Sequence, residues 1–315
     1  MAEVVLLDGG MGQELIRRGG QPATPLWSTQ LLIDRPGLVA EVHASYAEAG
    51  ATVATTNTYA IHRDRLRGGD SNHYAAGGTE LPDMEGQFEA LLRAALSEAD
   101  PVRGRCRIAG SIGPLGASYR PDLHPDQDVA IALLSEVAAL LAPSVDILLF
   151  ETIPSLDAAR ACLAAGRRTD RPVWLSFTVN DEDGGRLRSG EPVAEAARIA
   201  AEADAALLNC SVPEAMPAGL DALADAGVPF GAYGNGFTRI EQEFVDGGST
   251  ASSLEVRRDM GPEDYAAHAL AWVEQGATIV GGCCEVGPDH IAAVARRLEA
   301  AGHSIVSPDA GRAAA

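Results

Sequence analysis

The chain has 315 residues, 46% of them hydrophobic, so it is long enough to bury a large core. Its formal net charge of −20 argues against nucleic acid as a partner, because the phosphate backbone attracts basic surfaces. No run of roughly 18 or more apolar residues occurs, so we expect no membrane-spanning helix and no membrane partner. The cysteine count, five, is odd, and the N-terminus enters a strand without a basic leader. We therefore expect a cytoplasmic protein whose cysteines serve a metal or catalysis rather than disulfides.

Eight short, nearly continuous apolar segments predict β-strands buried on both faces. We expect these strands at 4–7, 52–55, 107–109, 146–150, 173–177, 205–208, 229–233 and 277–280. Helical patterns lie between them, at 36–50, 127–141, 156–166, 193–203, 215–227 and 262–276, with a last one starting near Pro288. This alternation predicts an α/β fold, a (β/α)8 TIM barrel with parallel strands. The alternative is an open doubly wound sheet, although no GxGxxG follows the first strand.

The organisation along the chain predicts one domain over residues 1–303 and a disordered tail over 304–315. Three polar, glycine-containing connections interrupt the alternation, at 68–78, 180–192 and 236–261. The last two leave the carboxyl ends of predicted strands, where barrel enzymes carry their active-site loops. They are either covers for a site or solvated insertions.

Polar residues follow the predicted strands at their carboxyl ends, which meet at one mouth in a barrel. One such residue would mean little, but seven of the eight strands end this way. The candidates are Asp8, Asn57, Ser111, Glu151, Cys210, Tyr233 with Asn235, and Cys283 with Cys284.

Three of these strand-end residues are cysteines, and they form a candidate metal site at the C-terminal mouth. Zinc prefers thiolate ligands, and catalytic zinc keeps three protein ligands and one exchangeable position. Cys283 and Cys284 are adjacent, so they can share an ion only where the chain leaves strand geometry, which the glycines at 281 and 282 permit. The alternatives are cysteines that serve as small apolar residues, or an oxidised vicinal pair. Cys106 and Cys162 have no ligand-like neighbours, and we expect them to be structural.

Zn²⁺ held by three thiolates would be a poor generator of hydroxide, because the sulfurs already donate so much charge. An incoming thiol matches a borderline-soft ion better and is deprotonated when it binds. A free thiol is only a few per cent ionised at neutral pH, so such a site would supply a thiolate without a separate base. The chemistry indicated is therefore alkylation of sulfur.

Several motifs together resemble the homocysteine S-methyltransferase family. They are Leu7-Asp8-Gly9-Gly10-Met11, Leu26-Trp27-Ser28-Thr29-Gln30, Glu151-Thr152-Ile153-Pro154-Ser155, Asn209-Cys210-Ser211, and Gly281-Gly282-Cys283-Cys284 with Pro288-Asp289-His290-Ile291. The likeness runs from about residue 5 to residue 298 and is strongest to the compact members that use S-methylmethionine or S-adenosylmethionine. It implies a zinc barrel with Cys210, Cys283 and Cys284 as ligands. It also implies that Asp8 and Glu151 hold the homocysteine amino group, with Gly9 and Ser111 near the carboxylate.

The residue chemistry agrees with these implied roles. Asp8 and Glu151 could accept charge-assisted hydrogen bonds from an ammonium group, although Asp8 could instead cap the turn before a helix. A sulfonium donor is cationic, so the faces of Trp27 and Tyr233 could hold it by cation–π attraction, or these rings could be plain packing. Asn57 and Asn235 could orient polar ends of the substrates.

We therefore predict a zinc-dependent enzyme that transfers a methyl group from a sulfonium donor to L-homocysteine, giving methionine. Its partners are these two small molecules, and the sequence does not distinguish a monomer from a homo-oligomer. Two alternatives remain. One is the same chemistry with betaine or another donor, or with selenocysteine as acceptor; the other is a non-catalytic zinc-binding barrel.

Overall fold

Among the residues that the structure describes, nine strands form one parallel sheet in the order β2-β3-β4-β5-β6-β7-β8-β1-β9. The computed structural model describes residues 1–20, 26–67, 83–240 and 254–308. The strands are β1 (Glu3–Leu6), β2 (Val53–Thr55), β3 (Arg107–Ile112), β4 (Ile147–Ile153), β5 (Val173–Phe177), β6 (Ala205–Asn209), β7 (Phe230–Tyr233), β8 (Ile279–Val280) and β9 (Ser304–Ile305). Each strand predicted from the sequence overlaps one of the first eight.

The sheet closes on itself between β1 and β2. Leu7 and Val53 form a parallel bridge. Next to it, the Thr52 N–H donates to the Leu6 carbonyl at 2.7 Å and the Asp8 N–H donates to the Val53 carbonyl at 3.1 Å. Since β1 also pairs with β8, eight parallel strands complete a ring, which confirms the predicted TIM barrel.

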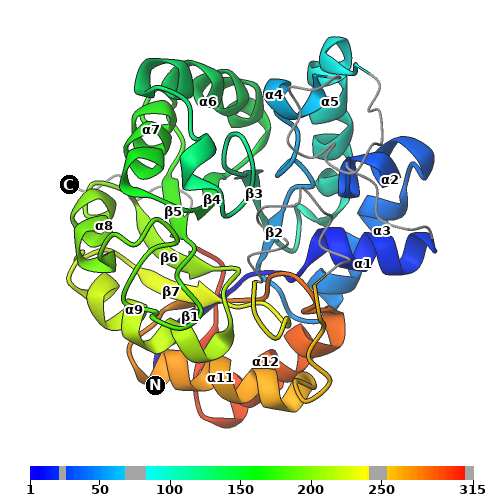
Figure 1. Ribbon diagram of the computed structural model, residues 1–315. Coiled ribbons are helices and arrows are strands. Elements are labelled where there is room, and N and C mark those ends of the chain that lie inside the picture. Colours follow the sequence, from blue (N-terminus) through cyan, green and yellow to red (C-terminus); the bar gives the residue numbers. More distant parts are fainter. Residues whose placement is uncertain (21–25, 68–82, 241–253, 309–315) are drawn as a thin grey trace.

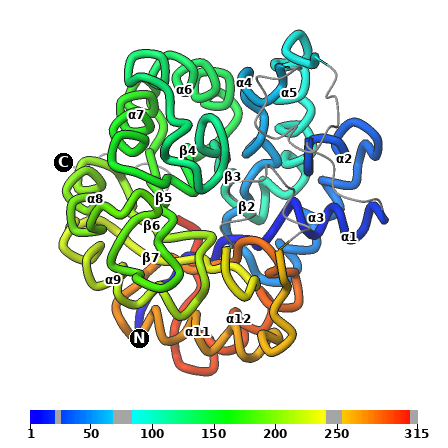
Figure 2. Tube along the Cα trace, in the orientation of Figure 1, coloured from blue at the N-terminus to red at the C-terminus, as the bar shows by residue number. Residues whose placement is uncertain are grey.

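The helices surround this ring (Figures 1 and 2). Neighbouring helices pack on one another, as α6 does on α7 and α11 on α12. The helices are α1 (Met11–Gly19), α2 (Ser28–Asp34), α3 (Leu38–Glu48), α4 (Arg63–Leu66), α5 (Phe88–Ala99), α6 (Gln127–Leu141), α7 (Leu156–Gly166), α8 (Val193–Ala200), α9 (Met216–Ala224), α11 (Pro262–Glu274) and α12 (Pro288–Ala300), with 3₁₀ turns at Glu85–Gln87, Asp100–Val102, Pro121–Leu123, Ala142–Ser144 and Pro213–Ala215. The sequence analysis anticipated a helix shortly after Asp8, where α1 lies, but did not predict α2, α4 or α5.

Alternate strand residues divide the core into two parts. In β4, Ile147 and Leu149 lie in a cluster that fills the barrel, while Leu148 and Phe150 pack with the helices. The interior cluster comprises Leu7, Val53, Ala109, Ile147, Leu149, Trp174, Ala205, Leu207, Tyr233 and Ile279. The filled interior leaves the carboxyl-end mouth as the place for a site.

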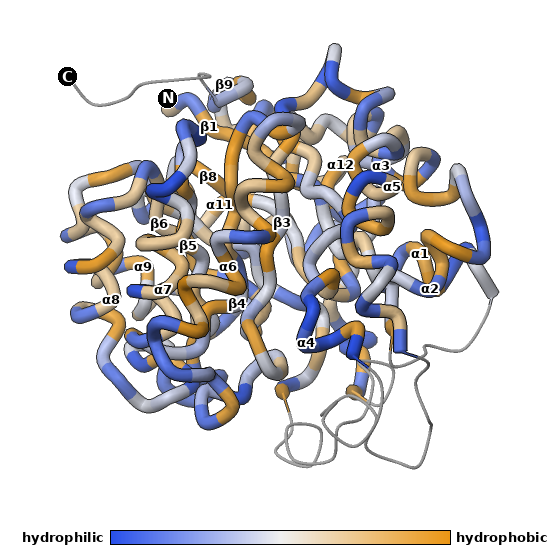
Figure 3. Tube along the Cα trace, turned by 90° about the horizontal axis from the view of Figure 1, so that it is seen from above, coloured by the Kyte–Doolittle hydropathy of each residue, from blue (hydrophilic) through white to orange (hydrophobic). Residues whose placement is uncertain are grey.

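The predicted disordered tail begins too early. Ser304 and Ile305 form β9, which pairs with Glu3 and Val4 of β1. The Thr52 hydroxyl bonds the next carbonyl, that of Val306, at 2.9 Å. Tertiary pairing thus orders a short segment whose strand-forming residues, Ile305 and Val306, are too few to predict a strand. Residues 309–315 lie outside the described part of the chain. In Figure 3, β9 and the N-terminus lie at one end of the barrel, and α4 lies at the other.

One helix in the described ranges, Gln127–Ser144, is long and apolar enough to span a membrane by length and composition. It consists of α6 and the 3₁₀ turn that follows, and it packs against α7 and β3. Its buried residues, Ala130, Leu134, Val137, Ala138 and Leu141, lie on one face. This is the pattern of a helix in the outer layer of a barrel, so the composition is weak support for a membrane span.

Candidate metal and substrate site

Three cysteine sulfurs meet at the carboxyl-end mouth. Cys210 follows β6, and Cys283 and Cys284 follow β8. The three Sγ atoms lie within 4.8 Å of one another, and those of Cys210 and Cys284 are 3.7 Å apart. Zn–S bonds of about 2.3 Å at tetrahedral angles require sulfurs about 3.8 Å apart, so the cluster could hold a metal ion with little movement. Cys106 and Cys162 are buried elsewhere, as expected for structural cysteines.

Backbone geometry turns the cysteine side chains toward one another. Cys210 has φ 52°, a left-handed conformation that is rare for a residue other than glycine. Its N–H still donates to the Tyr233 carbonyl at 3.2 Å, and the Cys283 N–H donates to the Gly234 carbonyl at 2.9 Å. These bonds attach both cysteine segments to the end of β7. Backbone strain of this kind costs about 1–3 kcal/mol and concentrates at functional sites.

The two glycines before Cys283 act through close packing rather than through unusual backbone angles, which corrects the sequence-based explanation. Neither has a positive φ. A Cβ on Gly281 would lie 2.5 Å from Cβ of Leu7, and one on Gly282 would collide with the side chain of Val286. Residues 281 and 282 must therefore be glycines because they pack tightly between the end of β1 and the turn that carries Val286.

Asn209 organises the strand ends beside the sulfurs. Its Oδ1 accepts from the Thr152 N–H at 2.8 Å and from the Ser176 hydroxyl at 2.9 Å, and its Nδ2 donates to the Thr152 hydroxyl at 2.9 Å. These bonds hold Thr152 in a left-handed conformation, φ 58°, where the register of β4 shifts. Sequence analysis noted Asn209 in a motif but did not include it among the site residues; its place at a strand end next to Cys210 was the available signal.

Glu151, in β4, has a buried carboxylate that points into the barrel mouth. It accepts hydrogen bonds from the hydroxyl of Ser111 and, at 3.1 Å, from that of Tyr233. The pKa of Glu151 is raised to about 7, chiefly by burial and also by the nearby charge of Cys210, while the two hydroxyls oppose the shift. The structure thus brings Ser111 and Tyr233 together around Glu151, with Tyr233 acting through its hydroxyl and its ring packed in the barrel interior.

Asp8 follows β1 and is also buried, with 2% exposure. Its two oxygens accept from the backbone N–H of Thr55 at 2.7 Å and from the Thr55 hydroxyl at 2.8 Å. Burial raises the pKa of Asp8 to about 8, and repulsion from Glu151 adds to the shift. Asp8 does not cap the following helix, because the N-cap of α1 is Gly10 and receives no side-chain bond. The mouth therefore holds two interacting carboxyl groups whose raised pKa values favour the protonated form. A cation bound beside them would favour the ionised form.

The three cysteines of the cluster also shift one another's pKa values. The pKa of Cys210 lies well below its usual range, chiefly because Cys283 and Cys284 hydrogen-bond its sulfur. The pKa values of Cys283 and Cys284 are raised in turn, and contact with Cys210 is the largest cause for both. Without a metal, the cluster therefore favours one thiolate, centred on Cys210.

The turn after β1 lies against the cysteine turn. The Gly10 N–H donates to the Val286 carbonyl at 2.9 Å. A Cβ on Gly9 would collide with that same carbonyl, and one on Gly10 would lie 2.5 Å from the Cys283 carbonyl oxygen. Gly9 is thus at the mouth as predicted, and glycine is required there so that two backbone segments can touch.

Trp27, Asn57 and Asn235 lie around this centre. The Trp27 indole donates to Gln13 at 3.2 Å, and Gln13 donates to Glu285, the residue after Cys284, at 2.6 Å. Asn57 donates to the carbonyl of Ser28 at 3.2 Å, so it anchors the start of α2. Asn235 accepts from the Phe237 N–H at 3.1 Å, and its buried Nδ2 has no partner among the described residues.

The closed barrel with a three-sulfur centre at its mouth has the architecture of a (β/α)8 enzyme, and its site could bind a metal ion or a thiol. A sequence profile described as homocysteine S-methyltransferase matches residues 5–298. The chain therefore belongs to the homocysteine S-methyltransferase family and is a methyltransferase.

Individual relatives agree over nearly the whole chain. Homocysteine S-methyltransferase YbgG of Bacillus subtilis is 30% identical over 310 residues, 93% of each chain. Selenocysteine methyltransferase of Astragalus bisulcatus is 28% identical, covering 93% of this chain and 92% of the relative. The metallated crystal structure of the homocysteine methyltransferase MmuM of Escherichia coli is 28% identical and superposes with a TM-score of 0.71, covering 93% of this chain and 96% of that structure.

Proposed function

We propose that this chain, acting as one domain in the cytoplasm, transfers a methyl group from a sulfonium donor to L-homocysteine and so makes methionine. We further propose that Cys210, Cys283 and Cys284 hold a zinc ion for this reaction. The observation that carries the proposal is the cluster of three sulfurs beside two buried carboxyl groups. A purely structural zinc site would need a fourth protein ligand and would have no use for these carboxyls.

The three cysteines fit zinc by ligand type and by spacing. Sulfur donors select zinc among the abundant divalent metals, and the shortest sulfur pair, 3.7 Å, suits tetrahedral binding. When bound there, zinc would supply a position at which a substrate thiol loses its proton at neutral pH. The sulfurs come from two strand ends fixed by backbone bonds to β7, so the protein positions them in advance.

Asp8 and Glu151 would bind the ammonium group of homocysteine. Both are buried and both have raised pKa values, so the arriving cation would ionise them and form charge-assisted hydrogen bonds. The hydroxyls of Thr55, Ser111 and Tyr233 already orient the carboxyl oxygens, which leaves little freedom to be lost on binding. Backbone near Gly9 and Ser111 would face the substrate carboxylate. Holding the amino acid in this way would aim its sulfur at the cysteine cluster.

The thiol of homocysteine releases one proton to solvent when it ionises. The resulting thiolate forms a new S–CH₃ bond, the bond between the donor sulfonium and its methyl group breaks, and that electron pair stays on the donor as a neutral thioether. Trp27 and Asn235 would contact the donor, the first through its aromatic face and the second through its unpartnered amide. Asn57 would act indirectly, by fixing the segment that carries Trp27.

A selenocysteine acceptor is a second candidate, because the Astragalus relative is named for that substrate. A selenol is softer and more acidic than a thiol and would suit the same sulfur-rich site.

A side-by-side assay tests the proposal. Reduced protein with a measured zinc content is given homocysteine or selenocysteine with S-methylmethionine, S-adenosylmethionine or betaine. We expect methionine from homocysteine with one of the two sulfonium donors, and roughly one zinc per chain. Methionine formation with betaine, but with neither sulfonium donor, would show that the donor is not a sulfonium compound. Turnover after complete removal of metal would disprove the zinc assignment.

A further inference from the structure

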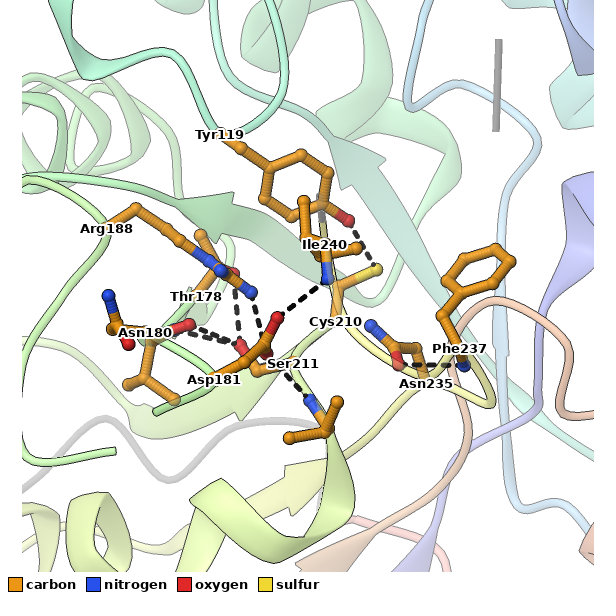
Figure 4. Close-up of polar contacts among 12 residues, drawn as sticks. Tyr119, Thr178, Asn180, Asp181, Arg188, Cys210, Ser211, Asn235, Phe237 and Ile240 are labelled. Atoms are coloured by element: carbon orange, nitrogen blue, oxygen red, sulfur yellow. Dashed lines mark hydrogen bonds and ion pairs between the residues drawn. The ribbon is translucent and has the colours of Figure 1, made fainter. Parts of the chain in front are cut away.

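A tyrosine hydroxyl reaches one of the three sulfurs. Tyr119, from the connection between β3 and α6, donates to Sγ of Cys210 at 3.0 Å (Figure 4). Its side chain is buried, with 7% exposure. Apart from the other two sulfurs, Cys283 has one weak side-chain contact within the described residues, at 4.0 Å from the amide of Asn209. Within the described residues, therefore, Cys210 alone among the three receives a hydroxyl donor.

The ring of Tyr119 is held in place by a cation. The guanidinium of Arg188 lies 5.3 Å from the ring centroid, and Arg188 donates to Asp181 at 2.8 Å. The side chains of this ion pair are only 11% and 8% exposed, so solvent screens it weakly. Tyr119 itself has φ 64°, a left-handed conformation that persists only where the surroundings enforce it.

Asp181 connects three loops of the barrel mouth (Figure 4). It lies after β5 and also accepts the N–H of Val212, after β6, at 3.0 Å and the N–H of Ile240, after β7, at 2.8 Å. Val212 is two residues beyond Cys210. One carboxylate thus fixes both the chain that carries Cys210 and the arginine that positions Tyr119.

The bond between Tyr119 and Cys210 lies in an apolar environment. Tyr119 and Cys210 form a buried cluster with Phe237, Ile240 and Leu254, and Cys283 and Cys284 pack against it. In such a low-dielectric setting a hydrogen bond to a charged sulfur is stronger than the same bond in water.

We propose that Tyr119 is a positioning residue for Cys210, whose hydroxyl fixes the sulfur and withdraws charge from it, so that the three sulfurs are unequal metal ligands. The inference rests on the proposed metal site. A thiolate that accepts a hydrogen bond gives less charge to its ion, which leaves the ion a better acceptor for the thiol of the substrate. Outer contacts of this kind typically change metal affinity 10–100-fold.

The experiment compares Tyr119→Phe with the wild-type protein in two measurements that need no turnover. Zinc affinity is measured by competition with a chromogenic chelator, and Co²⁺-loaded protein is examined by absorption spectroscopy. We expect roughly 10–100-fold weaker zinc binding, because the loss of the bond that fixes the Cys210 sulfur outweighs the stronger donation of an unbonded thiolate. We also expect the sulfur-to-cobalt charge-transfer band at lower energy, because an unbonded thiolate gives up its electrons more readily.

Tyr46→Phe is the matched control. The Tyr46 hydroxyl is also buried but donates to a carbonyl, that of Val286, at 3.0 Å. This variant should leave the cobalt band unchanged. Arg188→Lys keeps the Tyr119 hydroxyl but weakens the contact that holds the Tyr119 ring in place. It should therefore shift the cobalt band in the same direction, but by less. If the Tyr119→Phe protein does not fold, Arg188→Lys is used in its place.

The outcomes separate the two proposals. Wild-type protein that binds neither metal overturns the zinc site and this inference together. Wild-type protein that binds both metals, with a Tyr119→Phe spectrum and affinity equal to its own, overturns only the role of Tyr119.

Discussion

At the scale of single residues, Cys210 differs from the other two cysteines of the cluster. It has a left-handed backbone, it is fully buried, and it accepts a tyrosine hydroxyl, whereas Cys283 and Cys284 are partly exposed. The other two face the mouth more openly and are the sulfurs beside which a substrate would arrive. The cluster therefore has one buried sulfur and two that are partly exposed.

Cys283→Ser should remove most of the bound zinc, because a serine hydroxyl is a far poorer zinc ligand than a thiolate. We expect methyl transfer to fall by more than the roughly 100-fold that loss of an outer contact causes. Metal analysis by mass spectrometry and a homocysteine assay check this. Cys162→Ala, which changes a buried cysteine of α7, is the control and should keep its zinc. Full zinc and full activity in Cys283→Ser would contradict the assignment.

Acid should weaken binding of the amino acid. Burial raises the pKa values of Asp8 to about 8 and of Glu151 to about 7, so protons occupy these groups as pH falls. A protonated carboxyl attracts an ammonium group weakly, so affinity should decline up to about tenfold per pH unit for each group that must ionise.

Methionine, the proposed product, is the right probe for this pH dependence, since it has the ammonium group but no thiol to titrate. Its dissociation constant should rise between pH 8 and pH 6 in calorimetric titrations. Asp8→Asn should bind more weakly at pH 8 and show a shallower dependence. An affinity that does not change over this range would exclude the carboxyl pair as the ammonium site.

At the scale of elements, the turn that joins β1 to α1 supports the cysteine turn after β8. Gly10→Ala would place a Cβ 2.5 Å from the Cys283 carbonyl and 3.1 Å from Cα of Cys284, so both backbone segments must shift. We expect at least about tenfold weaker zinc binding, comparable to loss of an outer contact. Gly104→Ala, at a turn with no atom within 4 Å of the new Cβ, is the control. Equal zinc affinity in both variants would show that the β1–α1 turn does not hold the cysteine turn in place.

The strands were predictable from the sequence because their apolar runs are nearly continuous, as burial on both faces of a barrel requires. Among the helices between β1 and β3, α3 was predicted but α5 was not. The buried positions of α5, which include Leu91, Leu92 and Ala95, have helical spacing, but the sequence analysis named no element between the polar connection at 68–78 and the strand at 107–109. The start of β9 could not be foreseen, since its pairing with β1 joins residues about 300 positions apart in the chain.

At the scale of the whole molecule, β9 supports the end of the barrel opposite the mouth. Truncation after His303 should remove the pairing with Glu3 and Val4 and the bond between Thr52 and Val306. We expect a loss of about 1–3 kcal/mol, which corresponds to a fall of several degrees in melting temperature. Thr52→Val, which removes only the side-chain bonds, should reproduce part of this loss.

The folded, truncated protein should keep its zinc and its turnover number, because the cysteine centre lies at the other end of the barrel. Melting curves together with metal analysis check both statements. A truncated protein that melts normally, or one that is folded but has lost its metal, would contradict this division of roles.

The sequence predicted which residues lie at the mouth better than it predicted the contacts among them. Strand-end positions identified Asp8, Glu151 and the three cysteines, because parallel strands deliver their carboxyl ends to one mouth. The sequence could not show that Tyr233 bonds Glu151 through its hydroxyl, nor that Asn209 and Asp181 tie the strand ends together. Such contacts depend on which side chains face each other after closure, and no local pattern encodes that.

The left-handed residues around the mouth, which include Cys210, Thr152 and Tyr119, set a limit on engineering this protein for heat resistance. Glycine would relax the backbone at each position, a gain of about 1–2 kcal/mol. Tyr119 is buried in a packed cluster, however, and deletion of a large buried aromatic side chain costs about 3–5 kcal/mol. Glycine substitution, a common route to heat resistance at left-handed residues, should therefore lower the melting temperature at Tyr119 rather than raise it.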